Sequence, residues 1–177
     1  MVDLREKVHE DQGLLKKIEM AIPGFRGYRK REDLRIADSL LREQLADKLK
    51  GVLRDLEQCR ETLTRKMEMD LLEDVGHLAI QCSTIETKVR HAEQGYTGIS
   101  ADYRIEESEL NRLYEWDLNL IRHIDSLKSS VGVLQNAVNS GVNDNIVTEM
   151  SNVNGKLREF TELFEKRREA ITGLGVE

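Results

Sequence analysis

Histidine and neighbouring carboxylates are the residues of this chain that could hold a metal ion. His77 follows Asp74 by three residues and Glu73 by four. Di-metal helical bundles use two such carboxylate–histidine units together with further inward-facing carboxylates. Acids and bases surround this unit along the chain, so we read it as part of a solvated helix face. The sequence therefore predicts neither a metal ion nor another cofactor.

Cysteine chemistry is the second possibility. Cys59 and Cys82 both occupy positions in a regular apolar pattern, which favours buried thiols that act as small hydrophobic groups. If one helix carried both, their separation would be about 35 Å, too far for a disulfide within one chain. Two such cysteines are typical of a reducing compartment. No ordering of Ser, His and Asp suggests a hydrolase, so we expect no enzymatic activity.

Anion binding is the third possibility, because one short segment differs from everything around it. It contains the only proline and places four basic residues within six positions, next to two aromatic residues. The first 35 residues carry a net charge of +2, whereas the whole chain carries −6. Such a segment could bind an anion such as a phospholipid headgroup, a nucleotide or a nucleic acid. The candidate residues are Pro23, Gly24, Phe25, Arg26, Gly27, Tyr28, Arg29, Lys30, Arg31 and Arg35.

A structural interpretation of the same segment stays open. Phe25 and Tyr28 would then close the end of a helical hairpin, and the arginines would pair with nearby glutamates. The acidic balance of the whole chain also argues against general nucleic-acid binding, which depends on neutralising phosphates.

The same region resembles a stretch found in uncharacterised prokaryotic helical proteins. The resemblance covers about the first 50 residues and rests on Ile22 to Tyr28, followed by Arg31 to Arg35 and Asp38 to Arg42. It implies a prokaryotic, cytoplasmic, all-helical protein. It transfers no catalytic residue.

Composition limits the class of protein that must position these groups. The chain has 177 residues, of which 39% are hydrophobic and 34% charged. One proline permits long helices, and two cysteines exclude a disulfide scaffold. No apolar run approaches the roughly 18 residues of a membrane span, and the acidic start does not resemble a secretion signal. We therefore expect a cytoplasmic protein without a transmembrane segment.

The main structural signal is a ladder of apolar residues from Leu34 to Ala92. Its members recur every three or four residues with a mean step of about 3.6, the period of an amphipathic α-helix. The ladder predicts one continuous helix about 90 Å long. Gly51 and Gly76 are the positions where we expect it to bend, if it bends at all.

Three further helices are predicted. A first helix spans about residues 3–22. A third begins near Ser100 and carries an apolar stripe from Leu110 to Val138, and a fourth follows the turn-forming residues 139–143 and ends before Gly173. Residues 129–143 carry no charge, which suggests either a loosely packed end of a bundle or a small interaction surface.

These helices predict an all-α, elongated antiparallel bundle of the three-helix, spectrin-like type. Residues 56–177 would form the bundle, residues 1–55 an N-terminal helical hairpin, and one long helix would join the two. The hairpin would leave a leucine face for a second copy, for another protein, or for the bundle itself after a bend near Gly51. We expect a homodimer, because two-fold symmetry is the commonest assembly. The leucine face consists of Leu40, Leu41, Leu45, Leu49 and Leu53.

The sequence therefore favours a non-enzymatic helical scaffold that binds another protein or itself. The alternative is a module that recognises an anionic ligand through residues 22–35.

Overall fold

The computed structural model describes residues 13, 15–22, 31–92 and 107–172, without the side chains of residues 31–35, 107, 108, 110 and 172. Four long helices make up most of this part: α2 (Arg31–Lys66), α3 (Met69–Arg90), α4 (Glu107–Ser140) and α5 (Asn143–Thr172). A shorter helical segment covers residues 15–21. The described residues contain no strand, so the predicted all-α class is confirmed.

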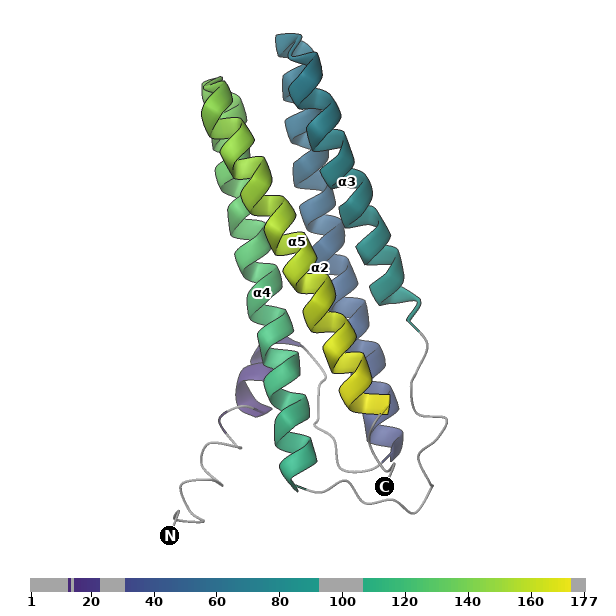
Figure 1. Ribbon diagram of the computed structural model, residues 1–177. Coiled ribbons are helices and arrows are strands. Elements are labelled where there is room, and N and C mark those ends of the chain that lie inside the picture. The colour runs from purple at the N-terminus through teal and green to yellow at the C-terminus, as the bar shows by residue number, and fades with distance from the viewer. Residues whose placement is uncertain (1–12, 14, 23–30, 93–106, 173–177) are drawn as a thin grey trace.

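The four helices form two antiparallel hairpins that lie side by side (Figure 1). α2 packs against α3 and α4, and α5 packs against α4 and α3, so α2 and α5 lie on one diagonal of the bundle. Lys48 pairs with Asp125 and Lys66 reaches Val138, which shows that α2 and α4 run in the same direction. Both hairpins therefore reverse at the same end of the bundle. We call this the turn end, and the opposite end the open end.

The predicted continuous helix from Leu34 to Ala92 is wrong. The chain reverses at Met67 and Glu68, and α3 returns along α2. The helices continue unbroken through Gly51 and Gly76, where a bend was expected. The bundle thus contains four long helices, and the predicted boundary between residues 55 and 56 falls inside α2.

Backbone hydrogen bonds explain how the reversal is built. The Met67 N–H donates to Thr64 O at 3.1 Å and the Glu68 N–H donates to Leu63 O at 3.2 Å, the pattern of a Schellman motif. Met67 takes the left-handed conformation that this motif requires, with φ = 60°. Arg65 and Lys66 place positive charge at the negative, C-terminal end of the α2 dipole, and Asp70 places negative charge in the first turn of α3. Both arrangements are favourable.

The second reversal agrees with the sequence. The turn-forming residues 139–143 do separate α4 from α5. Gly141 has φ = +76° and its N–H donates to Ala137 O at 3.0 Å, which closes the last turn of α4. Lys66 Nζ donates to Val138 O and Asn139 O at 2.6 and 2.9 Å, so the two reversals contact each other.

One apolar core runs between the helices. The predicted stripes of α4 and α5 are buried from Leu120 to Val138 and at Ile146, Val153 and Phe160. Ile18 and Ile22 of the N-terminal segment belong to the same core. Among the ladder residues whose side chains are described, those from Ala37 to Val89 are buried except Met67, which is 84% exposed because it lies in the turn.

The leucine face is placed differently from the prediction. Leu41, Leu45 and Leu49 are buried in the core, and Leu40 and Leu53 are half-buried against it. The bundle itself therefore covers this face, through the reversal at Met67 and not through a bend near Gly51. The surface on which the homodimer prediction depended is occupied within one chain.

Candidate functional site

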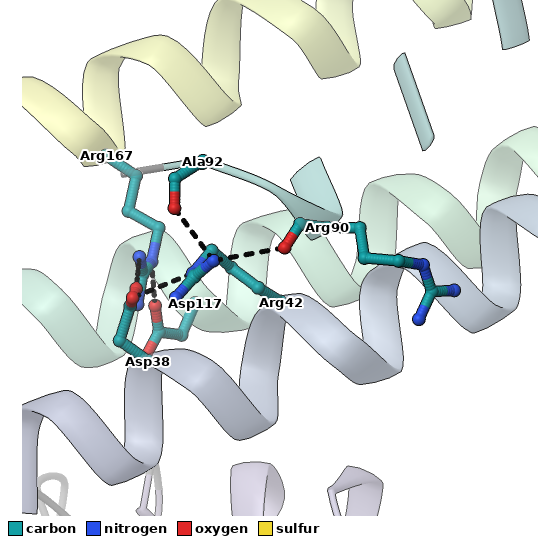
Figure 2. A network of polar contacts seen from close by, with 6 residues as sticks. All are labelled: Asp38, Arg42, Arg90, Ala92, Asp117 and Arg167. Atoms are coloured by element: carbon teal, nitrogen blue, oxygen red, sulfur yellow. Dashed lines mark hydrogen bonds and ion pairs between the residues drawn. The ribbon is translucent and has the colours of Figure 1, made fainter. Parts of the chain in front are cut away.

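Four charged side chains are buried together near the open end of the bundle (Figure 2). Asp38 and Arg42 come from α2, Asp117 from α4 and Arg167 from α5. Asp117 is fully buried, and the other three are at most 8% exposed. Buried charges of this kind are rare unless they are paired. They are the most unusual chemistry in the described part of the chain.

The four side chains form a chain of ion pairs. Arg167 donates from Nε to Asp117 Oδ1 and from Nη1 to Asp38 Oδ1, both at 2.5 Å. Arg42 Nε donates to the other oxygen of Asp38, Oδ2, at 2.8 Å. Arg167 therefore connects α5 with both α4 and α2, including the helix diagonally opposite.

Arg42 connects this series of ion pairs to α3. Its Nη1 donates to the main-chain oxygens of Arg90 and Ala92, at 3.3 and 2.9 Å. These carbonyls lie at the C-terminal end of α3, where helices have acceptors without an intrahelical partner and where a positive charge is favourable. We call Asp117, Arg167, Asp38 and Arg42 the ion-pair relay, because together they link all four long helices.

The relay is balanced in charge, with two aspartates and two arginines. Pairing offsets much of the cost of removing charges from water, and the additional hydrogen bonds to α3 offset more. Both guanidinium groups already face carboxylates, so an added anion would have to displace Asp38 or Asp117. The geometry suits positioning of helices better than binding of a ligand.

A groove of about 360 Å³ lies between α2 and α4 towards the turn end. Amide and hydroxyl side chains predominate in its lining. Gln135 Nε2 donates across the helix interface to Asp55 O and Gln58 Oε1 at 3.2 and 3.1 Å. The lining residues are Gln58, Cys59, Glu61, Thr62, Arg65, Gln135, Asn136, Val138 and Asn139.

A polar cluster between α4 and α5 resembles a serine–lysine pair. Lys156 Nζ donates to Ser126 Oγ, and the His123 Nε2 atom lies 3.0 Å from Lys156 O and 3.7 Å from Glu159 Oε2. Ser126 lies in the middle of α4, where backbone N–H groups are used by the helix. Acyl transfer needs free donors for an oxyanion, and the helix around Ser126 offers none.

The residues that the sequence singled out for chemistry lie elsewhere. His77, Glu73 and Asp74 are exposed on α3, as expected for a solvated face. Among the described residues, no three His, Cys, Asp or Glu side chains lie close enough to hold a metal ion. Residues 23–30 lie outside the described residues, as do the side chains of Arg31 and Arg35, so anion binding by this segment stays a prediction.

The two cysteines are free, buried thiols, as predicted. They lie on different helices of one hairpin, Cys59 on α2 and Cys82 on α3, not on one helix. Burial raises the pKa of Cys59 to about 11, with a contribution from Asp55, and raises the pKa of Cys82 to about 12, with a contribution from Glu86. Both thiols are therefore protonated and unreactive near neutral pH.

Exposed apolar side chains concentrate at the turn end. Of the eight large exposed hydrophobic residues among the described ones, five lie within about two helical turns of the two reversals. We call four of them the turn-end group: Met67, Met69, Val142 and Val147, which are 84, 68, 49 and 53% exposed. The fifth is Val133 of α4.

Sequence reasoning missed the ion-pair relay, although its members break the apolar stripes in a regular way. Arg167 lies between Phe164 and Ile171 at helical spacing, and Asp117 lies between Leu113 and Leu120. A charged residue at a stripe position is the available signal for a buried ion pair. A charged residue at a stripe position does not show which residue pairs with it.

Comparison with protein-family models, with curated proteins and with solved structures found no match for this chain. In the part of the chain that the structure describes, no helix has both the length and the apolar character needed to cross a membrane.

Proposed function

We propose that this protein is a non-enzymatic helical scaffold that binds a protein partner through its turn end. The supporting observation is the turn-end group, in which Met67 and Met69 are 84% and 68% exposed beside the Val142 reversal. Scattered exposed hydrophobic residues are normal in soluble proteins, whereas a concentration at one end suggests an interaction site.

The turn end is suited to protein recognition because its backbone is fixed and its side chains are adaptable. Capping hydrogen bonds hold Met67 and Gly141 in defined conformations, and Lys66 joins the two reversals. Methionine is unbranched and flexible, so it fits irregular partner surfaces. Burying each such side chain on a partner contributes about 1.5–3 kcal/mol.

The surface next to this group is polar but uncharged on the α4 side. Residues 129–143 contain no charged side chain. The amide-lined groove between α2 and α4 opens on the same half of the bundle. Amides offer both donors and acceptors, so the α4 side of this region can pair with the backbone of a partner without desolvating a charge.

Affinity capture from cells of the source organism tests the proposal, with two matched variants. One variant carries Met67→Glu, Met69→Glu and Val142→Glu. The control carries Ile80→Glu and Ile36→Glu, which change residues that are 66% and 62% exposed away from the turn end. Circular dichroism establishes that both variants keep their helical content.

The proposal predicts a protein that the wild type and the control retain and the turn-end variant loses. Light scattering on the same samples shows whether that partner is a second copy of this chain. An identical set of retained proteins for all three would contradict the proposal.

A further inference from the structure

The ion-pair relay links α4 with the C-terminal end of α3, although these two helices do not pack against each other. Asp117 on α4 pairs with Arg167, and Arg42 on α2 caps the end of α3. Between them, the Asp38 carboxylate accepts from Arg167 through Oδ1 and from Arg42 through Oδ2. Each carboxylate oxygen of Asp38 thus serves a different guanidinium group, as Figure 2 shows.

We propose that the relay acts as a latch, in which the pairing of Asp117 with Arg167 holds the C-terminal end of α3 in place. The inference is independent of the turn end and concerns the opposite end of the molecule. Its physical basis is the carboxylate of Asp38, which Arg167 and Arg42 share. A change at Arg167 alters the electric field at this carboxylate and its position, and therefore alters its hydrogen bond with Arg42.

The element that the latch controls is the last turn of α3. The His91 N–H donates to Thr87 O at 3.0 Å, and Arg42 donates to the oxygens of Arg90, the last residue of α3, and of Ala92. The ends of helices open more easily than their interiors, so this turn has a bonded and a released state. Arg42 favours the bonded state by neutralising the carbonyl end of the helix.

Loss of the Asp117 charge changes the balance of the buried group. With Asp117 neutral, Arg167 keeps Asp38 as its charged partner among the four, and the group carries an excess positive charge. Asp38 is then drawn towards Arg167 and away from Arg42. The hydrogen bonds from Arg42 to the carbonyl oxygens at the end of α3 then weaken, although neither Arg42 nor α3 has been changed.

Amide hydrogen exchange of the full chain, resolved by NMR, tests the latch. The two probes are the amides of His91 and Leu72, which donate to Thr87 O and Glu68 O at 3.0 Å at opposite ends of α3. In the Asp117→Asn variant we expect the His91 amide to exchange about tenfold faster or more, and Leu72 to stay unchanged. Comparing two amides within one helix separates local release from general loss of stability.

A control removes a different ion pair made by α4. Lys48 and Asp125 pair at 2.6 Å between α2 and α4, and both are partly exposed. Asp125→Asn removes one charge as Asp117→Asn does, but outside the relay. We expect no change at His91 in this variant, because exposed ion pairs contribute little.

Asp117→Ser provides a second route if the Asp117→Asn variant fails to fold. Serine also removes the Asp117 charge, and its side chain is smaller than that of asparagine. It should release His91 in the same sense, because Arg167 again keeps Asp38 as its charged partner among the four. The latch is contradicted if His91 is unaffected in the folded variant, or if His91 and Leu72 accelerate by the same factor.

Discussion

At the scale of single residues, the two reversals place different residue types in the same left-handed backbone conformation. Each helix ends on a residue with positive φ, which is Met67 after α2 and Gly141 after α4. A residue with a Cβ pays about 1–2 kcal/mol for this conformation, and glycine does not. The exposed Met67 side chain has no core contacts that would offset this cost.

Replacing Met67 with glycine should therefore stabilise the protein by about 1 kcal/mol, because it removes the Cβ without removing buried surface. Urea denaturation followed by circular dichroism measures the free energy of unfolding. Gly141→Ala is the matched control, since a Cβ there would be strained at φ = +76° and would lie 3.3 Å from Lys66 Nζ. It should lower stability by at least about 1 kcal/mol. A loss of stability in Met67→Gly would contradict this account of the reversal.

The cysteines predict a fall in stability at alkaline pH. The unfolded thiols ionise near their ordinary pKa of 9.0, whereas the folded ones hold their protons until about pH 11 and 12. Above pH 9 the folded state binds more protons than the unfolded state, so the free energy of unfolding falls as pH rises. Each thiol contributes up to about 1.4 kcal/mol per pH unit to that slope.

Urea denaturation at several values between pH 8 and 11 checks this, using the double variant Cys59→Ala and Cys82→Ala. The variant should show a shallower dependence on pH, whatever its stability at pH 8. Equal slopes for wild type and variant would show that the thiols are not buried as described.

At the scale of elements, the sequence predicted the faces of the helices better than their connections. The stripe positions of α4 and α5 and the reversal at residues 139–143 are as expected. The reversal at Met67 escaped detection because Leu63, Met67 and Leu71 keep the helical spacing across it. No glycine, proline or asparagine marks the turn, and the charges of Arg65, Lys66 and Asp70 were the one local signal.

Leucines on α2 distinguish a core face from a self-association face. Leu49 is fully buried and Leu53 is half-buried one turn further along. We expect Leu49→Ala to lower the free energy of unfolding by about 2–5 kcal/mol and Leu53→Ala by clearly less. Denaturation at two protein concentrations provides the check, because a face that served a dimer would make the effect depend on concentration. Equal losses in the two variants would contradict the burial described here.

At the scale of the whole molecule, two hairpins lie in parallel with different chemistry at each end. The turn end carries exposed methionine and valine, and the open end contains the buried ion-pair relay. The sequence predicted an all-helical bundle but not which helices meet, because any two amphipathic stripes can pack together. The relay was missed for the same reason, since Asp38 and Arg167 are 129 residues apart and meet only across the diagonal of the bundle.

The relay predicts an asymmetry between single and paired substitutions. Arg167→Met leaves the fully buried Asp117 without its Arg167 partner and should cost about 3–5 kcal/mol in the free energy of unfolding. Adding Asp117→Leu removes the carboxylate that Arg167 neutralised and should recover most of that loss, while Asp38 and Arg42 remain paired. Thermal and urea denaturation of both variants measure this. Additive losses in the double variant would mean that the two side chains are not coupled.

The central claim is the reversal of the chain at Met67 and Glu68, and a distance between two spin labels tests it most directly. Labels at Lys50 and Thr87, both exposed, are introduced by cysteine substitution in a Cys59→Ala, Cys82→Ala background. A hairpin places the two positions on neighbouring helices whose axes are about 8–10 Å apart. One continuous helix would separate them by about 55 Å. We predict a short distance, well under half of the longer value, and a distribution centred near 55 Å would contradict the fold, the turn end and the relay together.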